Sequence, residues 1–421
     1  MKTIKYLIIG AGISGLTFAN YVKDDNYLIL EKENEVGGYC RTIKRGDFIW
    51  DYAGHFFHFK TEEFKKLFID NVDENDIIHK DKCTKILYKD SLIDYPFQTN
   101  IHQLEKEEFI DCLYDLFNKE EKEEYNNFLD MLYGKFGKSI VEKFLKPYNE
   151  KLYACDLHTL DTDAMGRFFP YANIKQIINN MKKNEDVSYN NKFLYPKNGA
   201  GSFINILYNN LDKNKVLLNS TITSIDMENK IVETNNGQTY KFEYLINTAP
   251  LNHFLELLKN NEFADLKNEL SYNQVLVFNL GFNKKSKFTK EHWMYIPNKN
   301  TNYYRIGFYD NILDSDKLSM YIEIGFDKNA KIDIDKQLQL TLENLLKDGI
   351  IDNETKLEEY VSIIMNPAYV HINGDTDKKV TNLKQEISKK NMYTIGRYGA
   401  WTYCSMEDSM IEAKKLAESL K

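Results

Sequence analysis

Three glycines near the start of the chain have the spacing of a phosphate-binding turn. Gly10, Gly12 and Gly15 form a GxGxxG pattern directly after the apolar run of residues 4–9, and a stretch with helical spacing follows. Such glycines allow a tight turn and bring a pyrophosphate close to a helix N-terminus, whose dipole favours anions. Glu31 ends the next apolar run, where its carboxylate can accept hydrogen bonds from an adenosine ribose. The segment therefore predicts a dinucleotide site.

A second glycine pair, Gly37-Gly38, follows Glu31 and is followed in turn by Arg41 and Thr42. This order resembles the extended fingerprint of the FAD-dependent amine-oxidase and glutathione-reductase superfamily, which NAD-only dehydrogenases lack. In that superfamily the second pair lets the chain pass close to the diphosphate. The resemblance implies FAD as the cofactor, bound through Gly10, Gly12, Ile13, Ser14, Gly15, Glu31, Lys32, Gly38, Tyr39, Arg41, Thr42, Gly54, His55, Arg397 and Tyr403.

The last stretch of the chain, residues 393–420, reads as a second strand, turn and amphipathic helix. In the same superfamily such a unit returns to the first lobe and aims its helix N-terminus at the flavin ring, where the dipole favours the electron-rich edge of the reduced ring. Gly396 and Gly399 would permit close approach, and Arg397 would add a positive charge. A helix that serves packing alone would not require these three residues.

Five further stretches narrow the resemblance to the UDP-galactopyranose mutases, in which they recur in the same order. The resemblance implies a flavin-dependent mutase that interconverts pyranose and furanose forms of a nucleotide-diphosphate sugar such as UDP-galactose, for surface polysaccharide or glycoconjugate precursors. It also implies that reduced FAD attacks the anomeric carbon through N5 while the diphosphate leaves, without net redox. The stretches are residues 51–59, 95–101, 144–154, 303–305 and 396–403.

Arginines are rare in this lysine-rich chain, which contains only five. A leaving diphosphate calls for permanently charged donors with a planar fork, which favours Arg over Lys. Arg167 and Arg305 match the two arginines that the family uses for this purpose, although each could instead form a surface ion pair. By resemblance the catalytic set is Arg167, Arg305, His55, Tyr295, Tyr369 and Tyr403, the tyrosines acting as hydroxyl donors around the diphosphate.

The resemblance also implies a nucleotide site on the helical part of the chain. Tyr148 and Tyr153 correspond to residues that pack on the uracil and ribose, but the family usually has Trp at the second position, so both UDP and dTDP stay open. The sugar could be galactose, N-acetylgalactosamine, arabinose, a deoxyhexose or a heptose. The expected substrate contacts are Tyr95, Phe97, Gln98, Tyr148, Asn149, Tyr153, Arg167, Asn190, Tyr295, Arg305 and Tyr369.

His55 and His58 have the HxxH spacing of a metal pair. No third or fourth ligand is evident in the sequence, so no metal site is predicted. His55 matches a family histidine beside the flavin ring, where it could hydrogen-bond the ring, whereas His58 is expected to be structural.

Length and composition exclude several other classes of protein. With 421 residues the chain is too long for one hydrophobic core, and a formal net charge of −8 without a basic tract argues against nucleic acid as a partner. Five cysteines without CxxC spacing indicate a reducing, cytoplasmic compartment. No apolar run approaches the roughly 18–20 residues of a membrane span.

The order of expected elements predicts an α/β fold in which the cofactor domain is discontinuous. We expect a Rossmann-like FAD-binding domain, an inserted α-helical domain and a mostly antiparallel β-sheet domain. The helical insert is a candidate interface for a homo-oligomer. We see no second dinucleotide fingerprint, so NAD(P)H as reductant would approach through the substrate cleft. The expected boundaries are 1–62, 190–250 and 376–421 for the FAD domain, 100–189 for the insert, and 63–99 with 251–375 for the sheet domain.

Two other functions use a similar fold. An FAD-dependent oxidoreductase of the amine-oxidase or protoporphyrinogen-oxidase kind would have a hydrophobic substrate tunnel, which does not require Arg167 and Arg305. A binding protein without flavin, as in the Rab GDP-dissociation inhibitors, would not require the intact glycine and Glu31 set.

Overall fold

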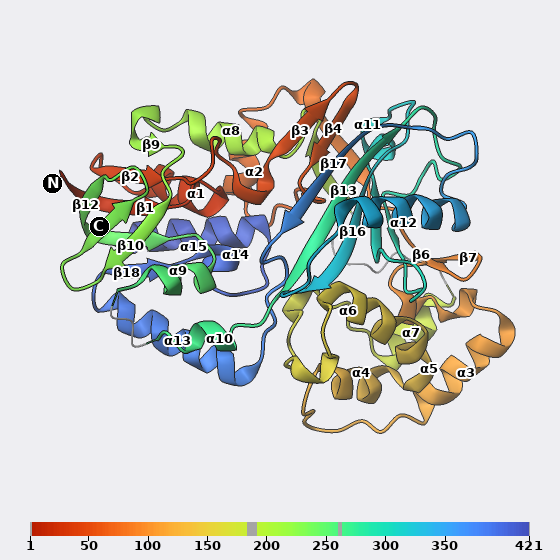
Figure 1. Cartoon of the computed structure of the whole chain (residues 1–421). Helices are drawn as coiled ribbons and strands as arrows, with labels where there is room; N and C mark the ends of the chain where they lie inside the picture. Colours follow the sequence, from red (N-terminus) through yellow and green to blue (C-terminus); the bar gives the residue numbers. More distant parts are fainter. Residues whose placement is uncertain (1, 183–191, 260–262, 421) are drawn as a thin grey trace.

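The computed structural model describes residues 2–182, 192–259 and 263–420 of the chain. Two seven-stranded sheets organise the molecule. In Figure 1 the first sheet and its helices lie on the left, the second sheet lies at the upper right, and a group of helices lies beneath the second sheet. Asn190, an expected substrate contact, lies outside the described residues.

The first sheet is built around β1, whose apolar residues are mostly buried because helices cover both faces of the sheet. β1 runs parallel to β2 and to β12, and the end of β12 runs parallel to β18, which brings the end of the chain beside its start. The strands of this sheet are β1 (Lys2–Ile9), β2 (Tyr27–Leu30), β9 (Val216–Leu217), β10 (Ile222–Asp226), β11 (Ile231–Thr234), β12 (Thr239–Asn247) and β18 (Met392–Thr394).

An antiparallel ribbon extends this sheet. β10, β11 and β12 pair in sequence, and the β11–β12 turn contains Asn236-Gly237 with Gly237 at φ +76°, a conformation that favours glycine. The predicted hairpin is confirmed.

Helices cover the two faces of the first sheet. α1 (Ile13–Tyr21), α8 (Gly201–Asn209) and α15 (Met406–Ser419) contribute to one hydrophobic cluster, in which α1 packs against α15. The opposite cluster is covered by α9 (Leu251–Leu257), α10 (Leu266–Glu269) and α13 (Gly374–Ser388).

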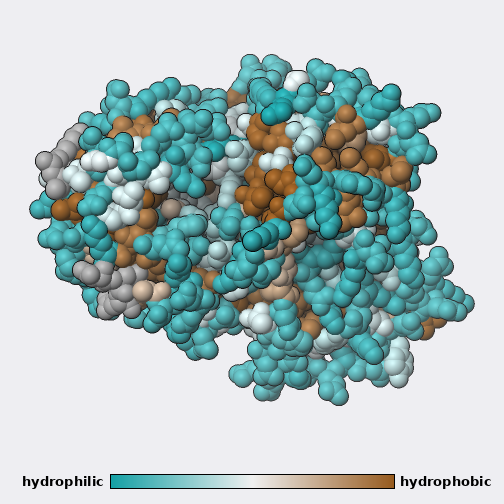
Figure 2. Space-filling view, viewed as in Figure 1, coloured by the Kyte–Doolittle hydropathy of each residue, from teal (hydrophilic) through white to brown (hydrophobic). Residues whose placement is uncertain are grey.

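The second sheet is antiparallel except for the β6–β14 pair. One face packs against α12 (Ile334–Lys347). Figure 2 shows an apolar area on the face of the molecule where this sheet lies in Figure 1. The strands, in spatial order, are β17 (Leu357–Met365), β13 (Asn273–Phe282), β16 (Ser319–Asp327), β15 (Arg305–Phe308), β14 (Trp293–Tyr295), β6 (Thr84–Tyr88) and β7 (Ser91–Asp94).

The helical group lies between β7 and β8 in the sequence and packs on the second sheet through α6 and β16. One turn of π-helix over Val141–Leu145 joins α5 to α6. These arrangements confirm the predicted fold class. The helices are α3 (Lys106–Phe117), α4 (Phe128–Phe136), α5 (Lys138–Ile140), α6 (Lys146–Tyr153) and α7 (Ile174–Asn180). The remaining elements are β3 (Thr42–Arg45), β4 (Phe48–Asp51), α2 (Glu62–Ile69), β5 (Ile77–Asp81), β8 (Lys192–Pro196), α11 (Tyr309–Leu313) and α14 (Gly396–Gly399).

A fully buried carboxylate ties the two parts of the molecule together. Asp51, at the end of β4, accepts hydrogen bonds from the Thr42 hydroxyl (2.6 Å), the Ala200 N–H at the start of α8 (2.9 Å) and the Tyr195 hydroxyl (2.9 Å). Its carbonyl oxygen accepts a fourth hydrogen bond from Asn279 of β13 (2.9 Å). The carboxylate thus joins the β3–β4 hairpin to α8 beside the second sheet.

We expect Asp51→Ala to lower the free energy of unfolding of the flavin-loaded protein by about 3 kcal/mol or more, because three buried donors would lose their acceptor. Urea denaturation measures the change. Asp47→Ala is the matched control, since the Asp47 side chain is 77% exposed and pairs with Lys317 on the surface, where a loss of at most about 0.5 kcal/mol is expected. Equal losses in the two variants would contradict the role given to Asp51.

Candidate functional site

The turn between β1 and α1 requires glycine at positions 10 and 15, whereas position 12 faces open space. Gly10 has φ +93°, and a Cβ at Gly15 would lie 2.1 Å from the Gly10 carbonyl oxygen. A Cβ at Gly12 would meet no atom within 4 Å. Gly12 therefore faces open space at the start of α1, which is where an anion would be favoured.

The second glycine pair lies beside this turn. Gly37 pairs with Gly12 as an isolated bridge, and the Gly37 N–H donates to the Ala11 carbonyl oxygen (2.8 Å). Glu31 is buried next to them, and its carboxylate accepts from the N–H groups of Ala11 (2.7 Å) and Glu33 (2.9 Å). Each carboxylate oxygen retains a lone pair that a ribose hydroxyl could use. The residues present fit the diphosphate and ribose of FAD.

The other expected cofactor residues lie around this turn with different partners. Lys32 is exposed and lies near Glu33, whereas Arg41 donates to the carbonyl oxygens of Glu35 and Val36. The Thr42 hydroxyl donates to Asp51 and accepts from the Gly201 N–H, and the Tyr39 hydroxyl accepts from the Asn366 N–H.

The terminal strand–turn–helix meets the first one directly. Gly396 has φ +80°, and a Cβ there would lie 2.3 Å from the Ser14 hydroxyl oxygen. α15 begins with a capping box in which Ser405 and Asp408 bond each other's main chain. Gly396 therefore allows the terminal turn to approach the start of α1 closely.

We expect Gly12→Val to abolish FAD retention while the chain still folds, because the added side chain would occupy only the open space at the α1 N-terminus. The flavin-to-protein absorbance ratio and the far-UV circular dichroism of the purified protein report the two properties.

Gly15→Val is the comparison variant, and we expect it to lose both folding and flavin through its clash with Gly10. A flavin-replete Gly12→Val protein would contradict the cofactor site.

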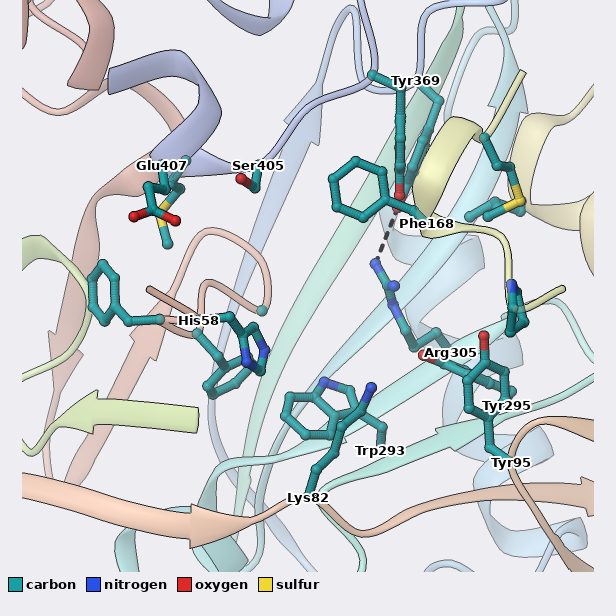
Figure 3. Close-up of a pocket in the computed structure, with 18 of the residues that line it drawn as sticks. His58, Lys82, Tyr95, Phe168, Trp293, Tyr295, Arg305, Tyr369, Ser405 and Glu407 are labelled. Carbon is teal, nitrogen blue, oxygen red and sulfur yellow. Dashed lines mark hydrogen bonds between the residues drawn. The ribbon is translucent and has the colours of Figure 1, made fainter. Parts of the chain in front are cut away.

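A cavity of about 320 Å³ lies between the second sheet, the helical group and the start of α15. Figure 3 shows its polar side chains converging from these elements, with Arg305 directed at Tyr369. Of the residues expected from the sequence, it brings together Gly54, Tyr95, Tyr148, Tyr295, Arg305, Tyr369 and Tyr403.

Arg305 is held by a buried carboxylate that the sequence did not single out. Its Nη2 donates to both oxygens of Glu323 (2.7 and 2.5 Å) and to the Tyr369 hydroxyl (3.1 Å). Tyr304 donates a further hydrogen bond to Glu323 (2.6 Å). Burial lowers the pKa of the Arg305 guanidinium, but Glu323 and the surrounding tyrosines together raise it further, so that it lies above its usual range. The Arg305 Nε has no partner among the described residues, so a donor remains for a ligand.

A second buried guanidinium, Arg397, is surrounded by aromatic rings. Its central carbon lies 4.6 Å from the ring centroid of Tyr403 and 5.3 Å from that of Tyr369, and its Nη1 donates to the Cys404 carbonyl oxygen (3.0 Å). Burial raises the pKa of Tyr403 to about 12, so its hydroxyl stays protonated and can donate. Arg397 thus contacts two tyrosines that line the cavity.

His55 lies on the loop after β4, next to Gly54, which lines the cavity. Burial, with Arg397 and Arg305 nearby, lowers the pKa of His55 to about 4, so the ring is neutral at pH 7. Its buried Nδ1 has no partner among the described residues. A neutral ring with an unused nitrogen fits a hydrogen bond to the FAD ring system. Gly54 is needed because a Cβ there would lie 2.2 Å from the Tyr321 hydroxyl oxygen.

The low pKa of His55 predicts acid sensitivity. As pH falls from about 6.5 to 4 the unfolded chain takes up a proton that the folded chain does not, so the free energy of unfolding falls through this window, by at most about 3 kcal/mol for this residue. Because burial also lowers the pKa of His58, His292 and His371 to about 4, we expect His55→Asn to reduce that dependence in urea denaturation by the share of one residue.

His253→Asn, at an exposed residue beside Glu256, should leave the dependence as in the unaltered protein. A pH dependence that His55→Asn does not change would count against a neutral, buried His55.

Four of the expected substrate contacts are buried in the core and do not line the cavity, namely Phe97, Gln98, Asn149 and Tyr153. Phe97 stacks on Phe144, which stacks on Tyr148. Three of these residues retain buried polar atoms without a partner among the described residues, which is costly unless a ligand uses them. These atoms are Gln98 Oε1, Asn149 Oδ1 and the Tyr153 hydroxyl oxygen.

Arg167, like His55, is an expected catalytic residue that does not line the cavity. Its side chain is 42% exposed, forms an ion pair with Asp408 and stacks over the Phe168 ring. The position corresponds to the surface ion pair that the sequence left open as the alternative.

The cavity also contains residues that sequence reasoning missed. Lys82 lines it from the connection between β5 and β6, Trp293 lines it from β14, and Ser405 and Glu407 line it from the start of α15. In the sequence these residues are distinguished only by lying close to expected motifs. Pairing between strands far apart in the sequence decides that they line the cavity. His58 also lines the cavity, although its Nδ1 donates to the Lys192 carbonyl oxygen (2.9 Å).

The described part of the chain contains no group of three or more His, Cys, Asp or Glu residues suited to hold a metal ion. Within it, every helix is too short or too polar to span a bilayer.

Comparisons with known proteins agree with this geometry. The sequence profile of a family described as flavin containing amine oxidoreductase matches residues 13–347. A crystal structure of reduced UDP-galactopyranose mutase has a TM-score of 0.93 and 22% identity, over 100% of this chain and 94% of the other. A candidate protoporphyrinogen oxidase from Exiguobacterium sp. 255-15 has a TM-score of 0.78 and 16% identity, over 100% and 99% of the two chains. Cyclohexylamine oxidase from Brevibacterium oxydans IH-35A has a TM-score of 0.68 and 13% identity, over 99% and 98%. At these identities the three structures share the fold.

Proposed function

The chain belongs to the flavin containing amine oxidoreductase family, and from this premise we propose that it is a mutase interconverting pyranose and furanose forms of a nucleotide-diphosphate sugar. UDP-galactose or a related UDP- or dTDP-linked sugar is the proposed substrate, and FAD in its reduced form is the proposed cofactor. The likeness to reduced UDP-galactopyranose mutase over the whole of this chain supports the choice of reaction.

The observation that carries the proposal is the Arg305 guanidinium in the cavity. It lies in an aromatic-walled space beside the Gly54–His55 loop, held by Glu323 and Tyr369. Amine substrates are cationic and would be repelled by Arg305, whereas a diphosphate is matched by an arginine with hydroxyl donors around it. The charge of Arg305 therefore favours an anionic group of the substrate beside it.

The residues of the cavity can bind and orient the proposed substrate. Arg305 would donate to a diphosphate oxygen, and the hydroxyls of Tyr369 and Tyr403 would donate to the others. Such fixed donors stabilise the negative charge that grows on a departing diphosphate. FAD, when bound and reduced, would supply the nucleophile for the anomeric carbon.

The unused polar atoms of the helical group support a nucleotide rather than a simple anion. Gln98 Oε1, Asn149 Oδ1 and the Tyr153 hydroxyl could all bond the edge of a pyrimidine base and its ribose. Tyr148 and Tyr95, which both pack near Tyr295, provide the aromatic surfaces for stacking. The base and diphosphate would then lie at two ends of one continuous site.

We expect Arg305→Ala to retain its yellow flavin and to lose about 100-fold or more in kcat/KM for the isomerisation of UDP-galactofuranose, because a charge-assisted interaction with the departing diphosphate would be removed. Chromatographic separation of products from the dithionite-reduced protein measures this.

Arg45→Ala provides the control, because the Arg45 side chain is 56% exposed and lies 4.0 Å from Glu359 on the surface. Full activity of the Arg305→Ala protein would exclude Arg305 from the site and would contradict the proposed function.

A further inference from the structure

The connection between β14 and β15, residues 296–304, is held by the ammonium group of Lys151 from α6. The Lys151 Nζ donates to the carbonyl oxygens of Ile296 (3.0 Å), Asn298 (2.9 Å) and Tyr303. An ammonium has three N–H donors, so these three carbonyl oxygens use all of them. Lys151 does not line the cavity, and it therefore can affect a ligand there only through the residues that it holds.

The two ends of this connection carry residues of the cavity. Tyr295 ends β14 and Arg305 begins β15, and the strand register places them opposite each other. Both line the cavity, and Figure 3 shows their side chains next to each other. Ile296 directly follows Tyr295, and Tyr303 lies two residues before Arg305. Because the bonds from Lys151 fall near both ends of the connection, they fix the point at which Arg305 enters the cavity.

The helix that carries Lys151 also carries an aromatic residue of the cavity. Tyr148 lies three residues before Lys151, about one turn earlier on α6. Its ring packs on that of Tyr295, with the ring centroids 5.1 Å apart. Lys151 therefore joins the helix of Tyr148 to the connection that ends at Arg305.

The main chain of α6 packs against the strand beside β15. A Cβ at Gly325 of β16 would lie 2.1 Å from the Lys151 carbonyl oxygen, so glycine is needed for this contact. Gly325 is two residues after Glu323, the carboxylate that holds Arg305. Lys151 thus contacts β16 through its main chain and the connection to β15 through its side chain.

We propose that Lys151 is a positioning residue that sets the distance between Tyr148 and Arg305, so that one nucleotide can contact both residues at once. This inference rests on the proposed function, because it takes the base to lie at Tyr148 and the diphosphate at Arg305. A ligand that spans two groups gains from both only when their spacing matches its own. Without the ammonium, three carbonyl oxygens would lose a donor, and the connection would no longer hold Arg305 at that spacing.

The test measures the affinity of the flavin-loaded full chain for UDP and needs no turnover. Titrations followed by flavin fluorescence are run at about pH 6, where Lys151 is charged although burial lowers its pKa to about 7. The unaltered protein, Lys151→Met, Arg305→Ala and the double variant are compared. We expect Lys151→Met to weaken UDP binding about tenfold, the scale of one lost charge-assisted hydrogen bond. In the Arg305→Ala background the same change should weaken it by less than about twofold, because the group that Lys151 positions is absent.

Lys299→Met is the matched control, because Lys299 also joins this connection to α6, through Glu150 (2.8 Å), but with a side chain that is 63% exposed. We expect UDP affinity to change by less than about twofold in this variant. Helix α6 keeps another buried bond to the second sheet, from Asn273 Nδ2 to the Leu152 carbonyl oxygen (2.6 Å), so we expect Lys151→Met to fold and to retain flavin.

Unchanged UDP affinity in Lys151→Met would overturn the inference while leaving the mutase proposal intact. Equal losses from Lys151→Met in the two backgrounds would also overturn it, because the effect would then not pass through Arg305. Failure of UDP to bind the unaltered protein would remove the proposed function and this inference together. If Lys151→Met does not fold, or Arg305→Ala no longer binds UDP measurably, a crystal structure of the unaltered protein with UDP decides the question. The inference requires the base at Tyr148, the diphosphate at Arg305 and all three Lys151 bonds intact, and any other arrangement overturns it.

Discussion

The buried pair of Arg305 and Glu323 is the interaction on which the rest of the site depends. A guanidinium inside a cavity is tolerated only when a carboxylate balances it, and the β15–β16 register places these residues opposite each other. Tyr321, two residues before Glu323, packs so closely on Gly54 and Gly307 that a Cβ at either would collide with its ring or hydroxyl. One strand of the second sheet thus fixes both Arg305 and the loop that carries His55.

The two strand–turn–helix units form one structure at the other side of the cavity. β12 lies between β1 and β18, so the turns that follow β1 and β18 emerge at the same edge of the sheet. Gly396 brings the terminal turn against Ser14, and α15 packs on α1. The sheet order therefore places one helix start at Gly12, which is open to a diphosphate, and the other at Ser405, which lines the cavity. The parallel pairing of these strands is enough to give the two helix starts these separate positions.

The local elements were predictable from the sequence, because each is determined by neighbours along the chain. The glycine turn with Glu31, the hairpin at Asn236-Gly237 and the terminal helix are of this kind. Glu323 and Lys82 were not predictable, because their positions follow from pairing between strands far apart in the sequence. The match of Arg167 to the family motif predicts only the residue type at this position. It does not exclude the ion pair that Arg167 forms with Asp408. The domain boundaries and the expected homo-oligomer remain predictions.

The same fold occurs in a candidate protoporphyrinogen oxidase and in cyclohexylamine oxidase, so the fold leaves open whether the reaction is an oxidation or an isomerisation. The charge on Arg305 and the unused polar atoms near Tyr148 favour the isomerisation of a nucleotide sugar. The most direct measurement is to incubate UDP-galactofuranose with the flavin-loaded protein, oxidised or dithionite-reduced, and to follow the ring form of the sugar by NMR. Conversion between furanose and pyranose only in the reduced sample, with no consumption of the reductant per turnover, is the expected result. An unchanged sugar in both samples, together with oxygen consumption when an amine or porphyrinogen is supplied, would contradict the mutase proposal.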